Sequence, residues 1–106
     1  MRESELYKEL GVLTKDRGKW KESIPDVSAL LSHESVKIQA KALWLLGEIG
    51  LVYPLSVQAE VPRIVSFCES PAPLLRERAL NALGWIGGML LVGVLFLAPF
   101  WMPVAT

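Results

Sequence analysis

Residues 24–50 read IPDVSALLSHESVKIQAKALWLLGEIG, and they match residues 61–87, which read VPRIVSFCESPAPLLRERALNALGWIG. The two stretches align without a gap at a constant offset of 37, and seven of the 27 positions are identical. Most identities fall in the pattern ALxxLGxIG, which begins at Ala42 in the first copy and at Ala79 in the second. Because similarity at a fixed period is the signature of repeat architectures, the sequence predicts two copies of one structural unit.

The first copy has the signals of two helices joined by a short turn. One helix is predicted over residues 23–32, because Ser23 and Asp26 have the spacing of a capping box and Pro25 then falls in the first turn. A polar break of three residues, which offers an N-cap, separates it from a second helix over residues 36–53. The second helix is expected to end before the following proline.

The second copy repeats this plan. Its first helix is predicted to start near Ser56 and to break at the proline-containing residues 70–73. Its second helix is predicted over residues 74–86, with the glycine pair at 87–88 ending it. A separate amphipathic helix, over residues 3–13, precedes both copies.

The helix over residues 36–53 has apolar residues on most of its circumference, and only a narrow polar stripe interrupts them. The apolar side contains Val36, Ala40, Leu43, Leu46, Ile49 and Gly50, and the stripe opposite contains Lys37, Lys41, Trp44 and Glu48. A lone pair of helices cannot bury such a face, whereas stacked pairs can, because each unit then covers its neighbour. The pattern therefore favours packed helical hairpins.

At this point the sequence resembles a known family. The second helices of both copies look like the second helix of HEAT repeats of the short bacterial and archaeal type related to phycobilisome lyases, with the pattern VRxxAxxALGxIG. The second copy carries the resemblance through Leu75, Arg76, Ala79, Ala82, Leu83, Gly84, Ile86 and Gly87, and the first departs from it at Gln39 and Leu45. The resemblance implies an α-solenoid that binds partners, usually proteins, on a concave surface lined by these second helices.

The predicted fold class is therefore all-α, with an α-solenoid-like stack of antiparallel, HEAT-like helical hairpins. About two repeats are expected, together with an N-terminal capping helix and an apolar C-terminal helix. The corresponding divisions are a capping helix and turn (1–22), a first hairpin (23–54), a second hairpin (55–88) and an uncharged apolar tail (89–106).

The candidate partner-binding residues come from the polar stripes of the two second helices. If these helices line the concave side, the offset of 37 pairs each stripe position with its equivalent in the other copy. The predicted set is Lys37, Lys41, Trp44, Glu48, Arg78, Asn81 and Trp85. Tryptophan and arginine are frequent anchors of protein interfaces. The alternative is that Trp44 and Trp85 only pack against the next hairpin or the tail.

The sequence predicts no enzyme, no metal site and no cofactor. The single histidine, His33, lies in a predicted turn without an orienting partner, and the single cysteine, Cys68, aligns with Leu31 and is predicted to be a buried apolar residue. Eleven acidic residues balance eleven basic ones, so the chain lacks the positive charge typical of nucleic-acid binding, and no nucleic-acid partner is expected.

The tail leaves three interpretations open, of which one is that it reflects truncation, gene fusion or a shifted reading frame, and the other two are physical. Residues 84–102 carry no charge and reach the roughly 18 to 20 apolar residues that a membrane span requires. In that case the tail would anchor the chain, with the repeats in the cytoplasm. However, the stretch free of glycine pairs and proline, from Met89 to Ala98, has only ten residues, which suits a buried helix better and leaves a cytoplasmic protein.

The predicted function is a non-catalytic, HEAT-like module for protein interaction or scaffolding, as part of a longer repeat array or by itself. One alternative is a membrane-anchored adaptor of the same fold, and another is a HEAT protein associated with a lyase or with DNA repair. Two repeats are fewer than the roughly three needed for independent stability, so self-association is also expected. The sequence does not identify the protein partner.

Overall fold

The chain folds into helices joined by short turns. The computed structural model describes the backbone of residues 2–101 and the side chains of residues 2–90, and it contains no strand within those limits. The α-helices are α1 (Glu3–Lys15), α2 (Trp20–Ala29), α3 (Val36–Val52), α4 (Pro54–Val57), α5 (Val61–Phe67) and α6 (Pro73–Trp101). Three 3₁₀ turns connect or extend them, at Arg17–Lys19, Leu30–Ser32 and Gln58–Glu60. The prediction of an all-α fold is confirmed.

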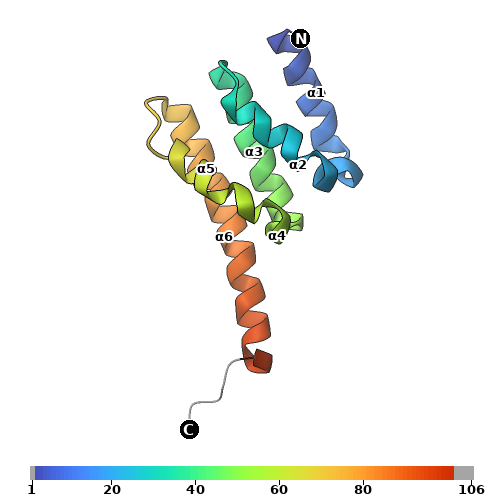
Figure 1. Cartoon of the computed structure of the whole chain (residues 1–106), viewed down its shortest axis with the longest axis vertical. Coiled ribbons are helices and arrows are strands. Elements are labelled where there is room, and N and C mark those ends of the chain that lie inside the picture. The colour runs from blue at the N-terminus through green and yellow to red at the C-terminus, as the bar shows by residue number, and fades with distance from the viewer. Residues whose placement is uncertain (1, 102–106) are drawn as a thin grey trace.

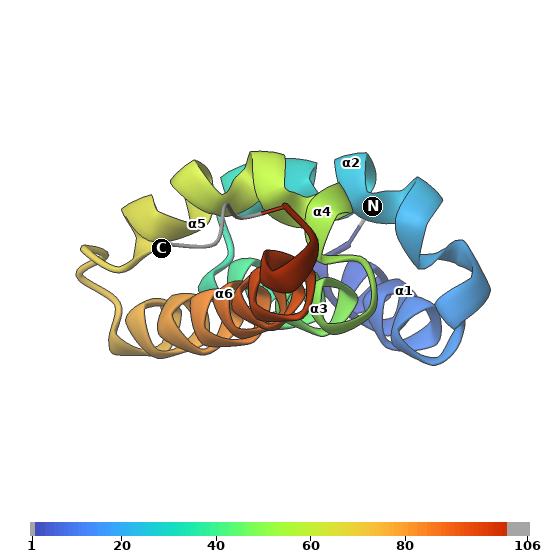
Figure 2. The ribbon, with the colours of Figure 1, turned by 90° about the horizontal axis from the view of Figure 1, so that it is seen from below.

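The helices form two layers (Figures 1 and 2). Helices α1, α3 and α6 lie side by side in one layer, and α2, α4 and α5 cover that layer from one side. Helix α3 occupies the centre of its layer, with α1 on one flank and α6 on the other. Its most extensive contact is with α6. The central position explains why α3 is apolar on most of its circumference.

Residues 37 positions apart occupy equivalent places in the core. Five such pairs have no member that is more than 4% exposed, and they are Val27 with Ile64, Ile38 with Leu75, Ala42 with Ala79, Leu45 with Ala82, and Ile49 with Ile86. The internal similarity of the sequence therefore corresponds to similar burial in the two halves of the structure.

Glycines let α3 and α6 approach each other closely. A Cβ atom placed on Gly47 would lie 2.6 Å from Cε3 of Trp85 and 3.0 Å from the Cα of Ala82. A Cβ atom placed on Gly50 would collide with the side chain of Ile86. The two glycines of α3 thus form a recess in which two large side chains of α6 are seated, and only glycine leaves room for them.

Helix α2 begins earlier than the sequence signals predict. It starts at Trp20, directly after a 3₁₀ turn, so Ser23 lies inside the helix and forms no capping box with Asp26. Pro25 is also inside the helix and not in its first turn. The reason is the anchoring of Trp20, which is 2% exposed and whose Nε1 donates a hydrogen bond of 2.8 Å to the carbonyl of Leu13. Burial of this indole outweighs the local capping signal.

Helix α3 agrees with the prediction at both ends. The backbone N–H of Ile38 donates to Oγ of Ser35, which is the N-cap, and the helix ends at Val52, before Pro54. One residue of its predicted apolar face is not buried, since Val36 is 42% exposed. It is the first residue of the helix.

The first helix of the second copy is interrupted. Where the sequence predicts one helix from about Ser56, the structure has α4, a 3₁₀ turn and then α5. Pro62 lies in the first turn of α5, where its missing N–H leaves no intrahelical bond unmade. The equivalent Pro25 lies within a continuous helix, so one repeat position takes two different local structures.

Helix α6 does not end at Gly87 and Gly88. It begins at Pro73, one residue before the predicted start, and continues through both glycines and through Pro99 to Trp101. No described glycine has a positive φ, so neither glycine takes the left-handed conformation that would end the helix. Glycine costs a helix only about 1 kcal/mol relative to alanine, which the long apolar sequence on either side offsets. The predicted boundary at residue 88 therefore lies inside a helix.

The candidate membrane span lies largely outside the described side chains, which end at residue 90. Residue 102, its last position, and the rest of the predicted tail to residue 106 lie outside the described residues altogether. Among residues 2–90, whose side chains are described, no helix combines the length and the apolarity needed to cross a membrane.

The glycine recess yields a prediction with an internal control. We expect Gly47→Ala to destabilise the fold by about 1–3 kcal/mol, because the added methyl group collides with Trp85 and with the backbone at Ala82. The equivalent residue in the second copy, Gly84, is exposed and has no atom within 4 Å of the same added methyl group. Gly84→Ala should therefore stabilise the helix by about 0.5–1 kcal/mol. Urea denaturation followed by circular dichroism measures both, and shifts of equal sign would contradict the described interface.

Candidate functional site

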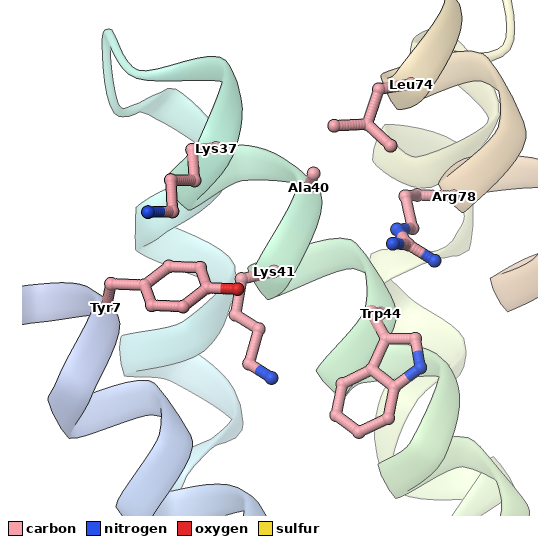
Figure 3. Close-up of a pocket in the computed structure, with 7 residues that line it drawn as sticks. All are labelled: Tyr7, Lys37, Ala40, Lys41, Trp44, Leu74 and Arg78. Atoms are coloured by element: carbon pink, nitrogen blue, oxygen red, sulfur yellow. The ribbon is translucent and has the colours of Figure 1, made fainter.

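A pocket of about 180 Å³ lies where α1, α3 and α6 meet (Figure 3). It opens on the face of this layer that α2 and α5 do not cover, since both helices lie behind it in the close-up. The residues that line it are Tyr7 from α1, Lys37, Ala40, Lys41 and Trp44 from α3, and Leu74 and Arg78 from α6. Three helices that are distant in sequence thus contribute to one site.

Helical periodicity places the α3 residues in this pocket. Lys37, Lys41 and Trp44 follow one another at spacings of four and three residues, so they form a stripe along one side of the helix. The neighbouring positions Ile38, Ala42 and Leu45 are fully buried against the rest of the protein. Since the buried side of α3 is fixed by the core, the stripe must face outward.

Aromatic rings hold the lysines of α3 in place. Nζ of Lys37 lies 4.3 Å from the centroid of the Tyr7 ring, and Nζ of Lys41 lies 4.4 Å from that of Trp44 and 5.7 Å from that of Tyr7. These are cation–π distances, at which the negative face of a ring attracts an ammonium group. The rings therefore favour the presence of two positive charges in a small space.

The pocket is positively charged and contains no acid. Lys37, Lys41 and Arg78 line it, and no aspartate or glutamate does. Among the described side chains the one ion pair joins Lys19 to Asp16, neither of which lines the pocket, and none of the three cations takes part in it. Arg78 extends from α6 toward Trp44 and forms no hydrogen bond to any described group. The site is thus an open pocket lined by a cluster of positive charges.

The structure brings together four of the seven residues predicted from the sequence. Lys37, Lys41, Trp44 and Arg78 all line the pocket. The other three do not: Glu48 is half-buried one turn beyond Trp44, Asn81 is exposed on α6, and Trp85 packs on Gly47. For Trp85, packing between the hairpins is therefore the observed role.

Sequence reasoning missed three lining residues: Tyr7, Ala40 and Leu74. Leu74 had a usable signal, since the offset of 37 makes it the equivalent of Lys37. Ala40 belongs to the predicted apolar face, and it is 4% exposed and lines the pocket. Tyr7 had no signal, because no sequence pattern says which flank of α3 the first helix covers.

The single histidine and the single cysteine lie outside this pocket. Nδ1 of His33 accepts a hydrogen bond of 2.9 Å from the backbone N–H of Ser35, so the side chain braces the turn before α3. Cys68 directly follows α5 and is half-buried, which corrects the prediction of a buried position on the helix.

A network of polar side chains holds the opposite layer together. Arg63 of α5 donates a hydrogen bond of 3.0 Å from Nη1 to the carbonyl of Ser28, and its Nη2 donates to Oγ of Ser32. The hydroxyl of Ser28 donates to the carboxylate of Glu60. These contacts join the first copy to the second and give Arg63 and Glu60 structural roles.

A second pocket, of about 260 Å³, lies between α1 and α2. Apolar side chains make up most of its lining, together with Glu9, Ser23 and Asp26. It contains no cation and none of the residues predicted to bind a partner.

Comparisons with known proteins add no family to this description. No protein-family model matches the chain, and neither the curated proteins nor the solved structures include a match. The site is therefore interpreted from its geometry and charge.

Two half-buried arginines should respond differently to the same substitution. Arg63→Met removes hydrogen bonds to Ser28 and Ser32, so we expect a loss of about 1–3 kcal/mol in the free energy of unfolding. Arg78→Met keeps the apolar stem and removes a charge that lies near two lysines and has no acidic partner. Its effect should stay within about 0.5 kcal/mol of the parent or be stabilising. Urea titrations of both variants test this, and a large loss for Arg78→Met would show that its charge has a structural role.

Proposed function

We propose that this chain is a non-catalytic, HEAT-like helical-repeat module that binds a protein partner on the outer face of α1, α3 and α6. In this proposal the two hairpins are consecutive units of an α-solenoid, and α1 covers the first of them. The face that carries the pocket serves as the binding surface.

The packing of the two hairpins supports the repeat interpretation. Five pairs of core positions 37 residues apart share the same burial, and α6 is seated in the glycine recess of α3. The equivalent positions of the second copy remain open, because Gly84 and Gly87 have no atom within 4 Å of an added methyl group and Leu80 is 61% exposed. This is the arrangement expected where a further unit of the same kind can be added.

One observation carries the proposed binding role: the convergence of Lys41, Trp44 and Arg78 from two consecutive units in one open pocket. Arginine and tryptophan are enriched among the residues that dominate the energy of protein interfaces. Arg63 and Glu60 of the other layer form hydrogen bonds that join the two copies, whereas the cations of the pocket have no acidic residue among its lining. Unpaired charges and an accessible aromatic ring lower the stability of a fold, so a face with only a structural role gains nothing from them.

The proposal is tested by affinity capture with the full chain and two charge-reversed variants. In the first variant, Lys41→Glu and Arg78→Glu reverse the charge of the pocket. In the second, Lys15→Glu and Lys21→Glu make the same change in net charge at exposed positions that line neither pocket. We expect proteins captured by the parent and by the second variant to be lost from the first, as measured by quantitative mass spectrometry.

Circular dichroism must first show that both variants are folded. Identical capture by all three chains would contradict a binding role for the pocket. Equal loss in both variants would indicate that net charge, and not this site, controls capture.

A further inference from the structure

The pocket has a composition that selects a particular kind of ligand. Three cationic side chains come from two helices, the rings of Tyr7 and Trp44 flank them, and no carboxylate lies among the lining residues. The chain contains as many acidic as basic residues, so a shortage of acids does not explain the absence of a partner. Glu3, the acidic residue of α1 nearest to Tyr7 on the same side of the helix, is engaged by a hydrogen bond of 2.7 Å from Oγ of Ser35.

We propose that this pocket binds the carboxylate side chain of an acidic peptide segment in a partner protein, with an adjacent apolar side chain of that segment lying against Trp44 and Leu74. The proposal rests on the proposed function and adds the chemical class of the partner. The planar guanidinium of Arg78 can donate two parallel hydrogen bonds to one carboxylate, while Lys37 and Lys41 act as point charges around it.

The size of the pocket favours a side chain over a free metabolite. Small-molecule sites typically enclose about 300–1,000 Å³, and this pocket encloses about 180 Å³. It is half open to solvent and lies along a helical face, so a peptide can enter with one residue and continue along the surface. Leu74 is 38% exposed beside it, which offers an apolar contact next to the charged one.

The overall charge of the chain favours a peptide over a nucleic acid. Binding along a polyphosphate backbone depends on many cations distributed over an extended surface. Here the formal net charge is zero, and three of the eleven basic residues line a single small pocket. A localised cluster of this kind matches a single carboxylate or a short acidic stretch.

The test uses the full chain labelled with ¹⁵N and three probes. The first probe is a ten-residue peptide of alternating glutamate and leucine with blocked ends, the second is the same peptide with glutamine in place of glutamate, and the third is a ten-nucleotide oligothymidylate. Chemical-shift titrations at low and at near-physiological salt measure the affinity for each probe. We expect the glutamate peptide to bind, with the largest shifts at Ala40, Trp44 and Leu74, and the glutamine peptide to bind at least about tenfold more weakly.

Two variants locate the binding. Lys41→Met with Arg78→Met should weaken binding of the glutamate peptide at least about tenfold, whereas Lys15→Met with Lys21→Met, which makes the same change in net charge, should alter it less than about twofold. Both variants keep apolar stems, and the unperturbed parts of their spectra report whether they are folded. Equal weakening in both would overturn the assignment to this pocket.

The remaining outcomes separate this proposal from the proposed function. Equal affinity for the two peptides, or tighter binding of the oligonucleotide, would overturn the acidic peptide as the ligand. If the glutamate peptide does not bind although affinity capture depends on the pocket, the ligand class is wrong and the binding role stands. If capture is also independent of the pocket, the proposed function itself fails.

Discussion

The close contact between α3 and α6 determines the arrangement of everything else in this protein. Gly47 and Gly50 leave a recess in α3, and Trp85 and Ile86 of α6 are seated in it. Ala82 of α6 belongs to the same contact, because its Cα lies 3.0 Å from a Cβ atom placed on Gly47. Protein interiors pack at high density, so this recess has no space for an added methyl group. The distance between the two helices, and with it the width of the pocket, follows from these small residues.

The two layers of the structure use their charged residues in different ways. In the layer formed by α2, α4 and α5, Arg63 and Glu60 form hydrogen bonds with Ser28 that join the first copy to the second. In the layer formed by α1, α3 and α6, Lys41 and Arg78 have no acidic partner. Hydrogen-bonded charges stabilise an interface, whereas unpaired charges in one pocket repel each other. The contrast between Arg63 and Glu60 on one side and Lys41 and Arg78 on the other is the physical basis of the proposed binding role of the outer face.

Local signals in the sequence predicted helix boundaries well where the tertiary structure agreed with them and poorly where it did not. Ser35 is the N-cap of α3 as expected, since nothing in the fold competes with it. The equally good signal at Ser23 failed, because burial of Trp20 starts α2 three residues earlier. Gly87 and Gly88 failed as a helix end for a related reason: glycine permits a left-handed conformation but does not impose it.

The amino-acid pattern was sufficient to establish the all-helical fold, the period of 37 residues and the side of α3 that faces outward. These properties depend on spacing along the chain, because helical periodicity converts spacing into a buried and an exposed face. It was not sufficient to place Tyr7 beside Lys37, or to separate the role of Trp44 from that of Trp85. Those relations depend on which helix flanks α3 on each side, and contacts between distant segments arise from packing that no local spacing encodes.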